Sequence, residues 1–271
     1  MQWGISSWAF PWAVGVPGHA PAVPMTAFDL VDRAAMLEVA VVQIADNLPL
    51  DALAEPDLLR LRRRGDELGI AFEVGTVGIE SAHLGRYRHI ARLLGSPILR
   101  TVVDTPAYKP TVAEVIAALE GLVPDFERDG ISLLIENHDR FPAESLRSIM
   151  EAVPSRGLGI CLDTVNSLAS LETVEVVLHT LRPWIKNAHI KDFAVRREDH
   201  KMGFRVFGTP AGEGALDLAN LVRELRTLPT LPSVILELWP APEEDLASAM
   251  AKEARWVSSS VRVVRRLLED A

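Results

Sequence analysis

Four polar residues stand at the ends of apolar segments, where an unpartnered ionisable side chain would be costly to bury. Glu136 ends ISLLIE, Asp163 ends LGICLD, Glu237 ends SVILE, and His189 lies near the end of the segment 184–190. Taken singly, each could be a polar group satisfied by its neighbours. Four residues in equivalent positions instead predict a shared site.

The types of these four side chains predict a metal site. Carboxylates that converge repel one another unless some stay protonated or a cation lies between them. Oxygen ligands with one imidazole and no thiolate favour Mn²⁺, Mg²⁺, Co²⁺ or Zn²⁺ over softer metals. We therefore predict one divalent ion, with Mn²⁺ as first choice, held by Glu136, Asp163, His189 and Glu237.

Eight strands that alternate with eight helices could position these residues. We expect strands at 3–7, 39–44, 70–74, 98–103, 131–136, 158–162, 184–190 and 234–237, and helices at 26–38, 50–68, 80–94, 111–128, 142–152, 169–181, 216–228 and 243–268. Continuously apolar strands are typical of a parallel sheet, and the helices supply its crossovers. The pattern predicts an α/β fold, a single-domain (β/α)₈ TIM barrel over residues 1–271, with its catalytic groups at the carboxyl ends of the strands.

Local signals place several boundaries. Thr26 is a predicted N-cap, and Gly69, Gly95 and Gly130 are predicted to end helices. Residues 6–24 read as a long irregular loop, and such loops are usually functional when they are ordered. Residues 192–214 read as a glycine-rich connection.

The composition restricts the class of protein. The chain has 271 residues, of which 48% are hydrophobic, and a net charge of −9, which argues against binding to nucleic acid or to an anionic membrane. Its single cysteine, Cys161, excludes an internal disulfide. We find no transmembrane segment and no secretory signal, so we expect a cytoplasmic protein. A homo-oligomer is possible.

Combined motifs resemble a known family. They are IENH at 135–138, CLDTVN at 161–166, AHIKD at 188–192, LE at 236–237 and PAGEG at 210–214. Together they resemble the xylose isomerase-like barrel family of sugar isomerases and epimerases, which is related to endonuclease IV. Endonuclease-type members carry more histidines and a multi-zinc site, which this sequence lacks. The resemblance therefore implies a small sugar or sugar acid as substrate, and no DNA partner.

The resemblance implies an isomerase or epimerase as the first hypothesis. A divalent metal would chelate a keto sugar and stabilise an enediolate, while Glu136 and Glu237 would bind the metal and move the proton. Similar epimerases carry a histidine three residues after the aspartate, where this chain has Asn166. The alternative is a metal-dependent lyase, a decarboxylase or dehydratase of a keto sugar acid such as 3-oxo-isoapionate. A non-catalytic sugar-binding barrel is the third hypothesis, disfavoured by the complete ligand set.

Lys191 is the third predicted catalytic residue. It lies two residues beyond His189, and side chains at this spacing share one face of a strand. It could neutralise an enolate oxygen or a substrate carboxylate, and so favour the lyase. The alternative role is a salt bridge with Asp192.

Five further residues are predicted to contact the substrate: His138, Asn166, Arg205, Glu213 and Trp8. Arg205 could bind a carboxylate or phosphate in a bidentate manner, through two N–H groups of its guanidinium group. The alternatives are a structural hydrogen bond for His138, solvation for Arg205 and helix capping for Glu213. Trp8 could form an apolar wall for a sugar face.

Overall fold

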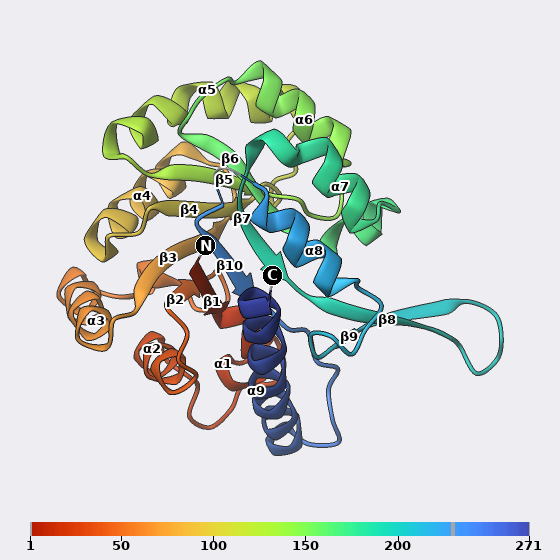
Figure 1. Ribbon diagram of the computed structural model, residues 1–271. Coiled ribbons are helices and arrows are strands. Elements are labelled where there is room, and N and C mark those ends of the chain that lie inside the picture. The colour runs from red at the N-terminus through yellow and green to blue at the C-terminus, as the bar shows by residue number, and fades with distance from the viewer. Residues whose placement is uncertain (1, 229–230, 271) are drawn as a thin grey trace.

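Eight parallel strands close into a barrel at the centre of the molecule (Figure 1). The computed structural model describes residues 2–228 and 231–270. The barrel strands are β1 (Gln2–Ser6), β2 (Val41–Ile44), β3 (Ala71–Val77), β4 (Ile98–Val102), β5 (Ser132–Glu136), β6 (Leu158–Asp163), β7 (Ile185–Ile190) and β10 (Ser233–Leu236). The first strand closes the barrel, because Ile5 is in register with Leu236 of β10 on one side and with Val42 of β2 on the other. The predicted (β/α)₈ barrel is confirmed.

Helices surround this barrel. They are α1 (Pro11–Val14), α2 (Ala27–Met36), α3 (Glu55–Leu68), α4 (Ser81–Leu94), α5 (Val112–Asp129), α6 (Ala143–Ala152), α7 (Val174–Leu181), α8 (Leu218–Arg226) and α9 (Leu246–Asp270). Thr26 caps α2 as predicted, and its side chain and that of Asp29 form a capping box. Gly69, Gly95 and Gly130 adopt the left-handed conformation that ends α3, α4 and α5. Within the described part of the chain, no helix combines the length and apolarity that crossing a membrane requires.

The hydrophobic core lies between the barrel and the helices. Phe126 and Leu119 of α5 and Leu133 of β5 are completely buried there. Burial of each such side chain contributes about 1.5–3 kcal/mol. The interior of the barrel differs, because it contains buried polar residues such as Gln43, Glu73 and Asn187. The apolar core thus packs the strands against the helices, and polar groups occupy part of the barrel interior.

The chain departs from the prediction in four places. The predicted irregular loop at 6–24 contains a 3₁₀ turn and the helix α1. Residues 192–214 are not a simple connection, because β8 (Asp192–Arg197) and β9 (Phe204–Thr209) form an antiparallel hairpin that projects from the body (Figure 1). The predicted helix at 50–68 is a 3₁₀ turn followed by α3, which begins one residue before Pro56. Proline favours the first turn of a helix because it lacks a backbone N–H. The helix predicted at 169–181 is likewise a 3₁₀ segment followed by α7.

Candidate active site

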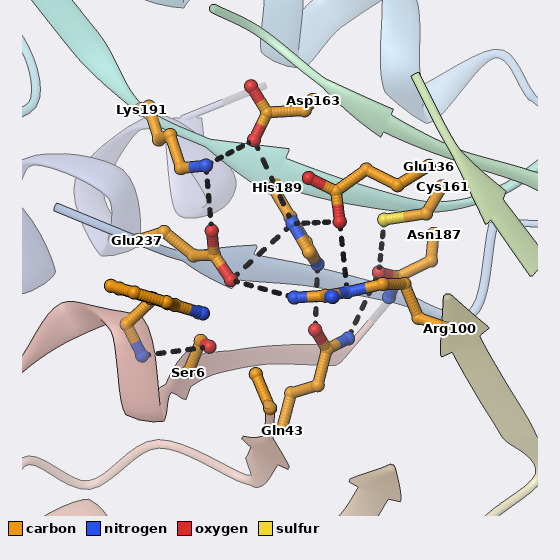
Figure 2. Close-up of polar contacts among 12 residues, drawn as sticks. Ser6, Gln43, Arg100, Glu136, Cys161, Asp163, Asn187, His189, Lys191 and Glu237 are labelled. Atoms are coloured by element: carbon orange, nitrogen blue, oxygen red, sulfur yellow. Dashed lines mark hydrogen bonds and ion pairs between the residues drawn. The ribbon is translucent and has the colours of Figure 1, made fainter. Parts of the chain in front are cut away.

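The four residues that end the apolar strands converge at one end of the barrel (Figure 2). His189 lies on β7, and its Nδ1 atom is 3.6 Å from Glu136 Oε2, 3.8 Å from Asp163 Oδ2 and 3.5 Å from Glu237 Oε1. Glu136, Asp163 and His189 lie on β5, β6 and β7, and Glu237 directly follows β10. These four strands are consecutive in the barrel, so the closure of the sheet brings the side chains to one point.

Backbone hydrogen bonds orient the carboxylate of Asp163. Its Oδ1 atom accepts hydrogen bonds from the backbone N–H groups of Val165 and Asn166, at 2.8 and 2.9 Å. The side chain of Asn137 binds both the N–H and the carbonyl of Asp163, which joins the ends of β5 and β6. Asp163 Oδ2 is therefore held towards His189.

These side chains fit a divalent cation. Glu136 Oε2, Asp163 Oδ2, His189 Nδ1 and Glu237 Oε1 are buried, and their partners among the described residues are ion-pair partners rather than hydrogen-bond partners. One ligand atom from each of Asp163, His189 and Glu237 lies within 4.8 Å of the others. Buried polar atoms of this kind are usually satisfied by a partner. One imidazole nitrogen and carboxylate oxygens form a donor set that suits a hard or intermediate divalent metal.

Two buried cations lie beside this cluster. Arg100 of β4 places Nε 2.9 Å from Glu136 Oε2 and Nη2 3.8 Å from Glu237 Oε1. Lys191 places Nζ 2.8 Å from Asp163 Oδ2 and 2.9 Å from Glu237 Oε2. The site therefore combines three carboxylates with two fixed positive charges.

Burial and charge act in opposite directions on the pKa values. Burial favours the neutral form of Glu136, but the charges of Arg100 and His189 hold its pKa well below the ordinary value. Burial also opposes the charge of Lys191, whereas Asp163 and Glu237 raise its pKa. In the same way, Glu136 outweighs burial and raises the pKa of Arg100. Both cations stay charged at neutral pH.

A cavity of about 410 Å³ opens onto these groups. Glu136, Glu237, Arg100 and Lys191 line it, together with the predicted substrate contacts Trp8, His138 and Asn166. Asn166 Nδ2 donates a hydrogen bond of 2.7 Å to Glu136 Oε1, so both oxygens of this carboxylate have partners. Trp8 and Trp239 form aromatic walls. The volume suits a small sugar-sized ligand.

Two predicted contacts lie away from this cavity. The side chain of Arg205 is 71% exposed on the hairpin and pairs with Glu198 at 3.1 Å. Glu213 is exposed in the segment between β9 and α8, where it borders a surface groove beside α9. The structure therefore gives Arg205 and Glu213 no contact with the cluster, because the hairpin carries that stretch outwards.

The carboxylate of Asp192 organises the loop beyond β7 and does not pair with Lys191. It accepts backbone N–H groups of Phe193, Gly212, Gly214 and Leu216 at 2.8–3.1 Å. A Cβ atom at position 214 would collide with this carboxylate, which explains a glycine in the PAGEG motif. The suggested Lys191–Asp192 salt bridge is thus replaced by pairing of Lys191 with Asp163 and Glu237.

The sequence reasoning missed Arg100 and the buried pair Gln43 and Glu73. Each is a buried polar residue within a mostly apolar strand. His189 Nε2 lies 2.7 Å from Gln43 Oε1, and Gln43 Nε2 lies 3.0 Å from Glu73 Oε2. A charged residue in the middle of an apolar segment is the sequence signal that could have identified Arg100 and Glu73, because such a residue needs a partner when the strand is buried.

Comparisons with known proteins identify the fold and the family of this chain. A curated relative, the 3-oxo-isoapionate decarboxylase of Pectobacterium atrosepticum, is 32% identical over 263 residues, which cover 96% of this chain and 94% of that protein. The chain also resembles the solved structure of D-psicose 3-epimerase in the presence of D-fructose, with a TM-score of 0.75 and 15% identity over 99% of both chains.

A second similar solved structure contains a metal. A xylose isomerase-like TIM-barrel protein from Mycobacterium smegmatis in complex with magnesium gives a TM-score of 0.69 at 14% identity, over 98% of this chain and 97% of that one. At such identities the solved structures show the fold alone. The family model for xylose isomerase-like TIM barrels matches residues 80–260. The chain belongs to the xylose isomerase-like TIM-barrel family.

Proposed function

We propose that this protein is a divalent-metal-dependent decarboxylase of a 3-oxo sugar acid. The observation that carries the proposal is the pair of buried cations, Arg100 and Lys191, at the cavity. A divalent cation would leave the carboxylates of Glu136, Asp163 and Glu237 with one net negative charge. The two buried cations outweigh that charge, and Asp46, which lines the cavity and pairs with Arg100 at 3.4 Å, brings the sum to zero. A cavity without net negative charge, and with Lys191 on its wall, can accept an anionic substrate. The full-length relative that acts on 3-oxo-isoapionate supports the same substrate class.

The chemistry suits these residues. The bond between the carboxylate carbon and its neighbour breaks, CO₂ leaves, and the electron pair forms an enolate that takes up one proton from solvent at carbon. A divalent cation bound to Glu136, Asp163, His189 and Glu237 supplies a Lewis acid for the developing oxyanion. Lys191 lines the cavity and places a fixed positive charge where that oxyanion develops. Trp8 and Trp239 line the cavity with aromatic surface.

The pairing of Glu136 favours decarboxylation over epimerisation. An epimerase needs a general base that removes a proton from carbon. Glu136 is bound by Arg100 on one oxygen and by Asn166 on the other. Decarboxylation needs no such base, because the departing carboxylate leaves its electron pair behind.

An isomerase or epimerase is the second candidate. Glu136 and Glu237 both line the cavity, and each places an oxygen within 3.6 Å of His189 Nδ1, so two carboxylates face one reaction centre. D-psicose 3-epimerase, whose solved structure has the same fold, is the precedent for this candidate.

A reaction in D₂O with Mn²⁺ separates these candidates. With 3-oxo-isoapionate, a decarboxylase releases CO₂ as fast as substrate disappears and places one deuterium at the product carbon. Exchange of a substrate C–H for deuterium with all carbons retained would instead identify an epimerase. A panel of keto sugars without a carboxylate serves as the control, and turnover of these alone would overturn the proposal.

The metal is tested separately. Protein purified without chelator is expected to contain about one divalent ion per chain by elemental analysis. His189→Ala lowers this content, whereas His179→Ala, at an exposed position of α7, leaves it unchanged. Full activity in metal-free protein would refute the metal site.

A further inference from the structure

A network of polar side chains lies inside the barrel beneath the cluster. It consists of Gln43 on β2, Glu73 on β3, Asn187 on β7 and Ser233 on β10, each at most 2% exposed. The interior of such barrels is usually filled with branched apolar residues. Polar groups in this position are costly unless they are hydrogen-bonded, so the network calls for an explanation.

Hydrogen bonds fix the orientation of the Gln43 amide. Its Nε2 atom lies 3.0 Å from Glu73 Oε2 and 3.3 Å from Asn187 Oδ1, and both of these are acceptors. A flipped amide would place its oxygen against the Glu73 carboxylate. Glu73 Oε2 accepts in either protonation state, because a proton on the other oxygen would face Ser233. Gln43 therefore turns its oxygen towards His189.

This orientation determines which ring nitrogen of His189 carries a proton. Gln43 Oε1 is an acceptor 2.7 Å from Nε2, so Nε2 must donate (Figure 2). Nδ1 then faces the three carboxylates, at 3.5–3.8 Å, and is the ring nitrogen that can offer a lone pair to a cation bound among them. Histidine ligands commonly donate their second N–H to a partner that orients the ring.

We propose that Glu73 and Gln43 form a positioning relay that holds His189 in the Nε2–H tautomer and presents Nδ1 as the metal ligand. Glu73 anchors the relay, since it also accepts from Asn187 Nδ2 at 3.2 Å and from Ser233. Neither relay residue contacts the cavity. The proposal rests on the metal site and not on the reaction catalysed, so it holds for a decarboxylase and for an epimerase alike.

The tautomer can be measured in the wild-type protein. Protein with ¹⁵N-labelled histidine is loaded with diamagnetic Mg²⁺, and long-range ¹H–¹⁵N correlations report which ring nitrogen is protonated. The His189 signals are identified by their loss in His189→Ala. The relay requires the proton on Nε2, and a proton on Nδ1 would overturn it. This measurement needs no relay variant to fold.

Substitutions test the role of the relay in metal affinity. Gln43→Leu removes the acceptor, and Mn²⁺ affinity measured by calorimetry is expected to fall about 10–100-fold. In the double variant Gln43→Glu with Glu73→Gln, the new carboxylate at position 43 accepts from His189, and the new amide at position 73 donates to that carboxylate. The Mn²⁺ affinity of the double variant is therefore expected to return close to wild type. Thr101→Val is the matched control, because its hydroxyl is buried in β4 and bonds only backbone carbonyls.

The outcomes are distinct. Wild-type Mn²⁺ affinity in Gln43→Leu, or equal weakening in Gln43→Leu and the double variant, would show a packing role only and overturn the relay. Equal loss of affinity in Thr101→Val would do the same. Absence of Mn²⁺ binding by the wild-type protein would refute the metal site itself, which is a different failure.

Discussion

Among the single residues, Lys191 has the most exposed position of the charged groups at the cluster. Its side chain is 14% exposed, whereas those of Asp163 and Glu237, which it joins, are at most 1% exposed. A fixed charge of this kind in a site shielded from water can contribute about 10²–10³-fold to the rate. It also offsets the repulsion between two ligands that must both stay ionised.

Lys191→Met is therefore expected to lower kcat by about 10²–10³-fold. Mn²⁺ affinity should not fall, because removal of the Lys191 ammonium group leaves the carboxylates of Asp163 and Glu237 free to attract the metal ion. Lys186→Met, in the same strand but at its amino end, is the control and should keep wild-type kcat. Steady-state kinetics and calorimetry give both quantities. Undiminished turnover in Lys191→Met would remove this residue from the catalytic group.

Arg100 has a different role, because it is buried with Glu136 at a distance of 2.9 Å. Loss of one partner of a buried ion pair costs about 3–5 kcal/mol, since the other charge is left uncompensated. Arg100→Met is expected to lose stability of this size in EDTA and less in Mn²⁺, because the metal replaces part of the missing charge. Urea unfolding in the two buffers measures the difference.

Arg88 supplies the control for that comparison. It forms ion pairs with Asp125 and Asp129 at the surface of the barrel, with 23% of its side chain exposed. Arg88→Met should cost only about 1 kcal/mol, equally in both buffers. If Arg100→Met lost the same stability in EDTA as in Mn²⁺, the metal would not lie beside Glu136.

At the level of elements, the barrel could be predicted because its strands are mostly apolar and alternate with helices. Glu136, Asp163, His189 and Glu237 could be predicted as a group for the same reason, since each interrupts an apolar pattern at a strand end. Their metal binding stays a prediction. Arg100 could not be placed, because its partners lie on other strands and meet it only when the barrel closes.

The sequence pattern did not predict the hairpin of β8 and β9, for a physical reason. Its strands lie outside the barrel and mix exposed arginines with Val195, Phe204 and Val206, so they lack the continuous apolar pattern of a buried strand. The sequence of residues 192–214 indicates a loop after the seventh strand, and Arg205 in such a loop could contact the substrate. A projecting ribbon carries it outwards instead.

Asp192 fixes the base of that hairpin, and its removal tests this. Asp192→Ala leaves four buried or half-buried N–H groups without their acceptor, and each unsatisfied group costs about 1–3 kcal/mol before relaxation or hydration. We expect a net loss of about 2–4 kcal/mol in urea unfolding. Asp217→Ala removes only the exposed N-cap of α8 and should cost about 1 kcal/mol. Equal losses in the two variants would contradict a special role for Asp192.

At the scale of the whole molecule, Glu253 joins the two ends of the chain. It lies on α9, and its carboxylate accepts the backbone N–H groups of Trp12 at 2.6 Å and Ala13 at 3.1 Å. The last helix is thereby attached to the segment that follows β1 and that also carries Trp8. Burial raises the pKa of Glu253 from 4.5 to about 7, against the two backbone hydrogen bonds that lower it.

This pKa predicts a stability that falls as the pH rises. Because the folded pKa of about 7 exceeds the unfolded value of 4.5, the folded state binds the proton more tightly, and the resulting stabilisation is complete below pH 4.5. It is lost as the pH rises through 7, a difference of about 2–3 kcal/mol between pH 5 and pH 8.

Glu253→Gln isolates this contribution, because every other titrating group is shared with the wild type. The amide keeps one acceptor oxygen but cannot titrate, so the variant is expected to be less stable at pH 5 and to lose less stability by pH 8. Urea unfolding at several pH values, in EDTA to keep metal binding constant, gives the difference between the two proteins. A difference that does not change with pH would show that Glu253 is ionised throughout this range and that its hydrogen bonds to Trp12 and Ala13 outweigh its burial.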